Sequence, residues 1–223
     1  RDLVRSRGLG DVYKRQVMAI AARELSLVGV AQMQDVVNGA VRPASTNPFR
    51  NAPTEPTEAD ILTLYRYKTG RYTFSLPMAI GATLAGAPEL TRLNLEEAGE
   101  HLGVVFQLKD DELGLFADEA ELGKPIGSDI REDKKTLFRL RLFGRVDGAE
   151  RSRLGAVFGN HEASQSDVDS VLVAMERSGV RAELAALMKA EAEAASLPLS
   201  ELLAAAPPRA ADAFRELVAY SLE

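Results

Sequence analysis

The sequence predicts an all-α protein, and three observations support this fold class. From Val17 onward, alanine, leucine, glutamate and arginine dominate, and these residue types have high helix propensity. Runs of β-branched residues, which favour strands, are short. Proline-rich connectors separate stretches that are long enough to form helices. No tandem repeat of about 30–45 residues is visible, which argues against a helical solenoid.

The first half of the chain predicts two helices joined by a long connector. The first helix runs from Val17 to about Gly39. The connector that follows is rich in proline, asparagine and threonine. The second helix starts at a capping signature, in which acidic residues follow Thr57, and it runs to Thr69. We expect Gly70 to interrupt the chain at that point.

The rest of the chain predicts a further series of helices. After Pro77 the segment MAIGATLAGA completes one helix, and a long helix follows from about Leu93 to Phe116. The segment ADEAELGKPIGSD is then expected to form a loop. Three or four more helices occupy the remainder, and the prolines at 207–208 mark the start of the last.

The composition excludes several classes of protein. The chain has 223 residues, of which 46% are hydrophobic, so it can bury one sizeable core. It has no cysteine, which excludes disulfides, thiolate metal sites and cysteine nucleophiles. The two histidines, His101 and His161, are too few and too far apart in sequence for a histidine metal cluster. No apolar run reaches the roughly 18 residues of a membrane span, so we expect a cytoplasmic protein.

The first sixteen residues differ from the rest in charge. Five basic and two acidic side chains give residues 1–16 a charge of +3, so the remainder carries −9 of the overall −6. This acidic balance argues against nucleic acid as the main partner. Residues 1–16 also lack the apolar region of a signal peptide. We interpret them as a non-native lead or, alternatively, a disordered basic tail, and expect residues 17–223 to carry the fold.

The stretch FQLKDDELGLF, residues 106–116, places two adjacent carboxylates in an otherwise apolar helix. One helix face carries Gln107, Asp110, Asp111 and Gly114, which are spaced i, i+3, i+4 and i+7. Glu100 and Gly103 extend this face toward the start of the helix. Isolated buried carboxylates are costly unless they are paired or bind a metal. The face is therefore either a solvated acidic edge or a site for a hard divalent cation. Mg²⁺ fits the second case because it needs only one or two carboxylates beside water and phosphate oxygens.

Three lysines follow this helix in the segment GKPIGSDIREDKKTL, at positions 124, 134 and 135. They are either simple counter-charges to the acidic face or part of a diphosphate site. In the second case a metal bridges the diphosphate oxygens and ammonium groups balance the remaining charge. The Gly-Lys pair is not a Walker loop, because no G-x-x-x-x-G-K-[ST] pattern occurs in the chain.

Three ordered motifs carry a family resemblance. Residues 106–137 resemble the second aspartate-rich region of the trans-isoprenyl diphosphate synthases, the polyprenyl synthetase family. The segment YKTGRYTFSLPMAIGATLAG is similar to the Lys-Thr segment of that family, and AQMQDV resembles its G-Q-x-x-D helix. The resemblance implies an isoprenoid-synthase-type helical bundle that assembles as a homodimer, with residues 17–223 forming its C-terminal part.

The resemblance also implies the chemistry and the residues. Mg²⁺ would assist ionisation of an allylic diphosphate, and the double bond of isopentenyl diphosphate would attack the cation in a 1′–4 head-to-tail condensation. The implied metal ligands are Asp110 and Asp111. The implied diphosphate-binding residues are Lys68, Lys124 and Lys134. The implied catalytic residues are Lys68, Thr69, Gln107, Gln32 and Asp35, where Asp35 orients Lys68 or a metal-bound water. A helix break at Thr69–Gly70 would aim carbonyl dipoles at the cation. We expect Lys68 to share one interior cleft with the acidic face.

The chain departs from the family pattern at several positions. Gly114 stands where the pattern has a third aspartate, Ala31 where it has glycine, and Asp133 where many members have glycine. No residues upstream of Val17 resemble the first aspartate motif of the family. We therefore interpret the chain as an inactive fragment of a prenyltransferase that lacks this motif.

Three alternatives remain at this point. The chain could be a non-catalytic regulatory subunit, which would truly lack the first motif. It could be a class I terpene cyclase, which shares the fold and the metal chemistry. An all-α nucleic-acid-binding regulator is the third alternative, and the acidic balance disfavours it.

Overall fold

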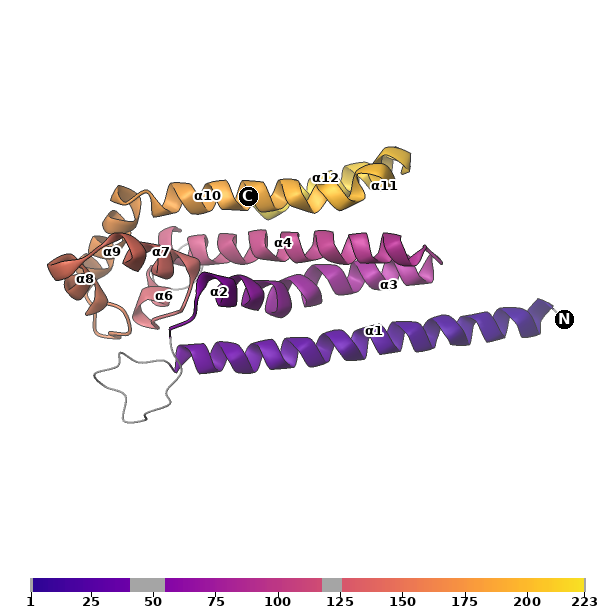
Figure 1. Cartoon of the computed structure of the whole chain (residues 1–223), viewed down its shortest axis with the longest axis horizontal. Helices are drawn as coiled ribbons and strands as arrows, with labels where there is room; N and C mark the ends of the chain where they lie inside the picture. The colour runs from indigo at the N-terminus through magenta and orange to yellow at the C-terminus, as the bar shows by residue number, and fades with distance from the viewer. Residues whose placement is uncertain (1, 41–54, 118–125, 223) are drawn as a thin grey trace. The chain divides into compact units, whose positions relative to one another are not determined.

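The computed structural model describes residues 2–40, 55–117 and 126–222, and the protein is all-α in these ranges, with no strand (Figure 1). The predicted fold class is confirmed. The chain divides into two compact units. Unit 1 contains Arg1–Met33, Leu64–Phe106 and Ala190–Glu223, and unit 2 contains Gln34–Thr63 and Gln107–Lys189. No described helix is long and apolar enough to cross a membrane.

Unit 1 is built from helices that come from three parts of the chain. They are most of α1 (Asp2–Gly39), the π-helix η2 (Arg66–Ser75), α3 (Leu76–Leu84), the first part of α4 (Glu89–Phe116), the end of α10 (Val180–Ser196), the 3₁₀ turn η3 (Leu197–Leu199), α11 (Ser200–Ala205) and α12 (Pro208–Leu222). In the core, Phe74, Leu102 and Ala195 are buried together. Met78 and three apolar residues of α12 pack against them. This cluster joins η2, α3, α4, α10 and α12.

Unit 2 contains shorter helices around the second part of α4. They are α6 (Ser128–Arg131), α7 (Leu137–Arg145), α8 (Gly148–Gly155), α9 (Gln165–Arg177) and the first part of α10, with the start of α2 (Glu58–Tyr65). Two aromatic pairs pack inside the unit: Phe116 with Phe138, and Phe143 with Phe158. The α9 helix begins with a capping box in which Ser164 and Asp167 satisfy each other's backbone N–H groups.

Two predicted helix starts are confirmed, and a third lies earlier than predicted. The backbone N–H of Thr57 donates to Asp60 over 2.8 Å, and the N–H of Asp60 donates to the Thr57 hydroxyl over 3.2 Å. This reciprocal pair starts α2 as the sequence predicted. The last helix starts at Pro208. The long helix α4 begins at Glu89, four residues before the predicted start.

The predicted interruption at Gly70, and with it a helix break at Thr69–Gly70, is wrong. The helical path continues from α2 through η2 into α3. The reason is packing, because Gly70 lies directly against α4. A Cβ atom added to Gly103 would lie only 2.0 Å from the Gly70 Cα atom, so the backbones meet where neither residue has a side chain. Pro77 lies in the first turn of α3, where the path changes from π-helical to α-helical.

The first helix is longer than predicted. The sequence predicted a helix from Val17, whereas α1 begins at Asp2 and continues to Gly39 without interruption. Residues 2–16 are therefore helical in the structure. Within this segment the Tyr13 hydroxyl lies beside Gly86 of the α3–α4 turn. That residues 1–16 are a non-native lead or a disordered tail stays a prediction.

The turn before α6 generates one prediction about stability. Gly127 has a φ of 75°, and a Cβ atom added there would lie 2.3 Å from Cγ1 of Val168. We expect Gly127→Ala to lower the free energy of unfolding by about 1–3 kcal/mol through backbone strain and overlap. Gly144→Ala on α7 is the matched control, because no atom lies within 4 Å of its added Cβ. Thermal unfolding followed by circular dichroism measures both. An unchanged melting temperature for Gly127→Ala would contradict the turn geometry.

The contact between α4 and α10 generates a prediction about pH. His101 Nδ1 lies 2.6 Å from Glu191 Oε2, and this hydrogen bond raises the pKa of His101 above its usual value. Burial and Arg66 oppose the rise, and the charges of Glu191 and Glu97 assist it. The stabilisation is complete below the pKa of unfolded histidine and is lost as pH rises through the higher folded pKa.

We therefore expect the melting temperature to fall across this pH range in the native chain and to change less in Glu191→Gln. The control is His161→Gln, because His161 is exposed and lies in a turn. If Glu191→Gln and the native chain have the same pH profile, the contact between His101 and Glu191 does not stabilise the fold.

Candidate functional site

The two neighbouring aspartates of α4 have different environments. Asp111 is 2% exposed, whereas Asp110 is exposed. The side-chain amide of Gln107 donates to Asp110 Oδ2 over 3.3 Å and to Asp111 Oδ1 over 3.2 Å. One amide group therefore holds both carboxylates on the predicted face, and Asp110 keeps access to solvent. The motif predicts that both side chains face an interior cleft, but only Asp111 is buried.

A third carboxylate, that of Asp129 on α6, lies in the same part of unit 2. Asp129 is buried, and Lys134 Nζ lies 2.5 Å from its Oδ1 atom. Burial alone would lower the pKa of Lys134, but the hydrogen bond and charge of Asp129 and the charges of Asp111 and Glu132 raise it. Lys134 therefore keeps its positive charge beside the acidic face while its side chain stays partly exposed.

Gly114 leaves room for Asp129. A Cβ atom added to Gly114 would lie 3.0 Å from Asp129 Oδ2, so the Asp129 carboxylate occupies the space beside this glycine. The family pattern has a third aspartate at the position of Gly114. In this chain a carboxylate from α6 lies there instead, one turn along α4 from Asp111. This contact was not predictable from spacing along one helix.

The adjacent side chains of Lys134 and Lys135 have different environments. Lys135 has a side chain that is only 3% exposed, and it pairs with Asp133 and with Glu55, 3.6 Å away. Asp133 also accepts a hydrogen bond from Arg139 Nε over 2.6 Å. Lys135 is therefore part of the packing of unit 2, and Lys134 is the lysine that can reach a ligand.

The conformation of Asp133 explains one departure from the family pattern. Among the described residues other than glycine, Asp133 alone has a positive φ, 54°. Glycine adopts this left-handed conformation freely, whereas aspartate does so at a modest cost. The ion pairs of Asp133 with Lys135 and Arg139 offset that cost.

The remaining predicted residues lie elsewhere in the chain. Lys68 and Thr69 lie on η2 in unit 1, both partly buried, and Gln32 lies exposed on α1. Asp35 lies on the part of α1 that belongs to unit 2. Lys124 lies outside the described residues. That Lys68 and the acidic face share one cleft stays a prediction.

The π-helix η2, which carries Lys68 and Thr69, is an unusual feature of unit 1. π-Helical turns are rare and occur often at functional sites. Here η2 lies close against α4 at two levels. A Cβ atom on Gly99 would lie 2.6 Å from the backbone nitrogen of Ser75, and the Ser75 hydroxyl donates to the Glu96 carbonyl oxygen over 2.7 Å. The second close contact between η2 and α4 is that of Gly70 with Gly103.

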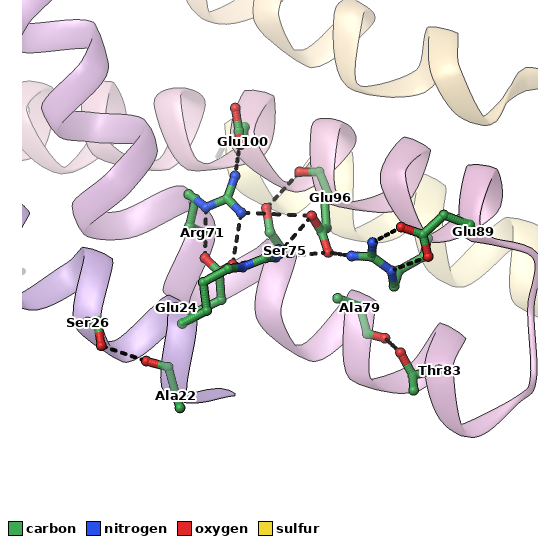
Figure 2. Close-up of polar contacts among 12 residues, drawn as sticks. Ala22, Glu24, Ser26, Arg71, Ser75, Ala79, Thr83, Glu89, Glu96 and Glu100 are labelled. Atoms are coloured by element: carbon green, nitrogen blue, oxygen red, sulfur yellow. Dashed lines mark hydrogen bonds and ion pairs between the residues drawn. The ribbon is translucent and has the colours of Figure 1, made fainter. Parts of the chain in front are cut away.

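Sequence reasoning missed a group of charged residues beside η2. Figure 2 shows Arg71 of η2 between Glu24 of α1 and Glu100 of α4, with Glu96 beside them. Glu24 is 1% exposed. Its burial would raise the pKa, but hydrogen bonds from Arg71 and Arg23 outweigh this effect and lower it. The available signal was a basic residue directly after the Lys-Thr-Gly sequence.

The carboxylates of the acidic face are suited to a metal ion that is held mainly by a bound phosphate compound and water. Among the described residues, no group of three or more histidine, aspartate or glutamate side chains is arranged to hold a metal alone. Mg²⁺ needs only one or two protein carboxylates when phosphate oxygens and waters complete its shell. The exposed Asp110 and the neighbouring Asp111 fit this requirement.

Comparison with solved structures identifies the fold class first. The chain is similar to a geranylgeranyl pyrophosphate synthase from Corynebacterium glutamicum complexed with isoprenyl diphosphate and magnesium, with a TM-score of 0.81 and 24% identity. The match covers 100% of this chain and 59% of that one. A geranylgeranyl pyrophosphate synthetase from Pyrococcus horikoshii matches with a TM-score of 0.77 over 95% of this chain and 59% of that one, at 25% identity. The fold is that of the all-α isoprenoid synthases.

Comparison of sequences identifies the family. Residues 5–175 match the family model described as polyprenyl synthetase, so the chain belongs to the polyprenyl synthetase family. A short chain isoprenyl diphosphate synthase from Methanocaldococcus jannaschii is 35% identical over 52% of this chain and 36% of its own length. A geranylgeranyl diphosphate synthase from Saccharolobus solfataricus is 38% identical over 51% of this chain and 34% of its own length. These alignments span about a third of each relative.

The contact between Gly114 and Asp129 generates a prediction. We expect Gly114→Asp to lower the melting temperature at neutral pH, because its carboxylate would crowd and repel those of Asp129 and Asp111. Adding Asp129→Asn should recover part of the loss, with a coupling of about 1 kcal/mol in a double-mutant cycle. Gly81→Asp on α3 is the control for helix propensity, because no atom lies within 4 Å of its added Cβ. Strict additivity of the two changes would contradict the contact.

Proposed function

We propose that this chain is the C-terminal part of a Mg²⁺-dependent prenyltransferase. The reaction is the head-to-tail condensation of isopentenyl diphosphate with an allylic diphosphate, which yields a linear isoprenoid diphosphate. Membership of the polyprenyl synthetase family supports the proposal. The observation that carries it is the charged Lys134 beside the acidic face of α4, at the motif positions where the family resemblance expects a diphosphate.

Each residue has a distinct part in this proposal. The ammonium groups of Lys68, Lys124 and Lys134 bind the allylic diphosphate and balance its charge. Gln107 holds the two carboxylates of the acidic face, and Asp129 holds Lys134 in place. Asp110 and Asp111 would bind Mg²⁺, which neutralises the charge that develops on the departing diphosphate.

The carbon chemistry then follows from the orientation of the substrates. The allylic carbon–oxygen bond breaks, inorganic diphosphate leaves, and the double bond of isopentenyl diphosphate forms the new carbon–carbon bond. The side chains of Thr69, Gln107 and Gln32 face the cation and stabilise its charge. Asp35 orients Lys68 or a bound water. The protein's contribution is mainly positioning and electrostatic stabilisation.

The proposal includes the remaining expectations from the sequence. The complete enzyme is a cytoplasmic homodimer, and condensation requires a first aspartate-rich motif in addition to Asp110 and Asp111. Metal ions on both sides of the leaving group are then available, whereas this chain supplies one side. The chain by itself is expected to bind magnesium diphosphate weakly and to be inactive.

The test is incorporation of radiolabelled isopentenyl diphosphate into acid-labile products. We expect none with this chain, and turnover when its N-terminus is completed with the first-motif helices of a full-length relative. In the completed enzyme, Asp110→Ala should lower the rate by about two to three orders of magnitude, the effect of losing ~3–4 kcal/mol of electrostatic stabilisation. Asp169→Ala on α9 is the matched control, because Asp169 is exposed and contacts Gln165 of its own helix.

The outcomes separate the alternatives. A cyclic hydrocarbon in place of a linear diphosphate would indicate a terpene cyclase. A completed protein without turnover would favour a regulatory subunit. Robust turnover by this chain alone would refute the fragment proposal, and near-normal turnover by Asp110→Ala would refute the metal assignment.

A further inference from the structure

A cluster of charged residues lies in unit 1, and two of its carboxylates are buried. It contains Arg23 and Glu24 of α1, Arg71 of η2, and Glu89, Arg92, Glu96 and Glu100 of α4. Glu24 and Glu96 are buried. Removing such groups from water costs several kcal/mol for each ion before pairing offsets it. The proposed chemistry uses none of these residues directly, so the cluster needs another explanation.

Arg71 is the one member of the cluster that lies on η2, and it contacts both neighbouring helices (Figure 2). Its Nε and Nη2 atoms donate to the two oxygens of Glu24 over 2.7 and 2.8 Å, as a two-pronged contact. Its Nη1 atom donates to Glu100. All three guanidinium nitrogens are engaged, which fixes the plane of the group between α1 and α4.

Arg71 follows closely after the residues that the proposed function assigns to the allylic diphosphate. Lys68 and Thr69 lie three and two positions before it on the same π-helix. The path of a π-helix is not set by intrinsic propensity, since this helix type is rare and occurs mostly as single turns. It must therefore be held by its neighbours. Gly70, between Thr69 and Arg71, lies against Gly103, where an added Cβ atom would lie only 2.0 Å from the Gly70 Cα atom.

We propose that Arg71 is a positioning residue for prenyl transfer: its contacts with Glu24 and Glu100 fix the register of η2, and this holds Lys68 and Thr69 at the allylic diphosphate. The inference rests on the proposed function, because it takes from it the roles of Lys68 and Thr69. The contact between Gly70 and Gly103 sets the distance between η2 and α4. The Arg71 contacts prevent η2 from sliding or rotating at that distance.

A purely stabilising role does not explain the cluster as well. Replacing a buried ion pair by apolar residues of similar volume is often neutral or stabilising, so such pairs are weak sources of stability. What an apolar pair cannot supply is a unique register, because apolar contacts have no fixed direction. Lysine cannot supply it either, because a single ammonium group does not reproduce the two-pronged contact.

The experiment uses the completed, active enzyme of the previous subsection. The variants are Arg71→Lys and the double variant Arg71→Met, Glu24→Leu, which removes both charges together. We expect both to remain folded, with kcat lowered about 10–100-fold and KM for the allylic diphosphate raised. KM for isopentenyl diphosphate should be unchanged. The control is Arg215→Met, because Arg215 contacts Asp212 of its own helix α12 and lies outside the cluster.

A second measurement separates positioning from a structural role. In a Lys68→Ala background, Arg71→Lys should lower kcat by a much smaller factor than in the native background, because one of the two groups that Arg71 positions is already gone. Full additivity of the two changes would overturn the proposal, as would kinetics like those of the native enzyme. Loss of folding in both Arg71 variants would overturn it too, because the role would then be structural. A completed enzyme without native activity would instead contradict the proposed function.

Discussion

The close approach of η2 to α4 is the constraint on which the organisation of unit 1 depends. Two glycines on α4, Gly99 and Gly103, let the backbone of η2 approach to a distance that any side chain would prevent. This approach places a rare π-helix in the middle of a continuous helical path, and the π-helix carries the Lys-Thr sequence. A partly buried arginine, Arg71, then ties the same segment to α1. Steric fit sets the distance between the helices, and directional hydrogen bonds set their register.

Unit 2 also contains ion pairs, and those of its two adjacent lysines differ in burial. Of two adjacent lysines, the buried one is paired inside the unit and the other projects beside the acidic face. The buried Asp129 links this second lysine to α4 by filling the space beside Gly114. The result is a fixed cationic group next to a pair of carboxylates. Such an arrangement suits a ligand that brings both negative charge and a metal ion.

The sequence predicted the features that depend on local chemistry. Helix-forming composition predicted the fold class, and the Thr57–Asp60 capping box and Pro208 predicted two helix starts. It did not predict features that depend on tertiary contacts. The path through Gly70 depends on Gly103, 33 positions later in the sequence. The pairing of Arg71 with Glu24 joins residues 47 positions apart. The candidate site residues were predicted from ordered motifs, whereas the contacts of Arg71 and Asp129 were not predicted, because a single sequence contains no signal for contacts between distant helices.

The central proposal is that Asp110 and Asp111 bind magnesium and that Lys134 and Lys68 bind the diphosphate on that metal. A crystal structure of this chain with Mg²⁺ and inorganic diphosphate tests it most directly. The account predicts a metal on Asp110 that shares oxygens with a diphosphate, with Lys134 and Lys68 within hydrogen-bonding distance of that diphosphate. Diphosphate bound away from Asp110, or bound there with Lys68 pointing elsewhere, would contradict it.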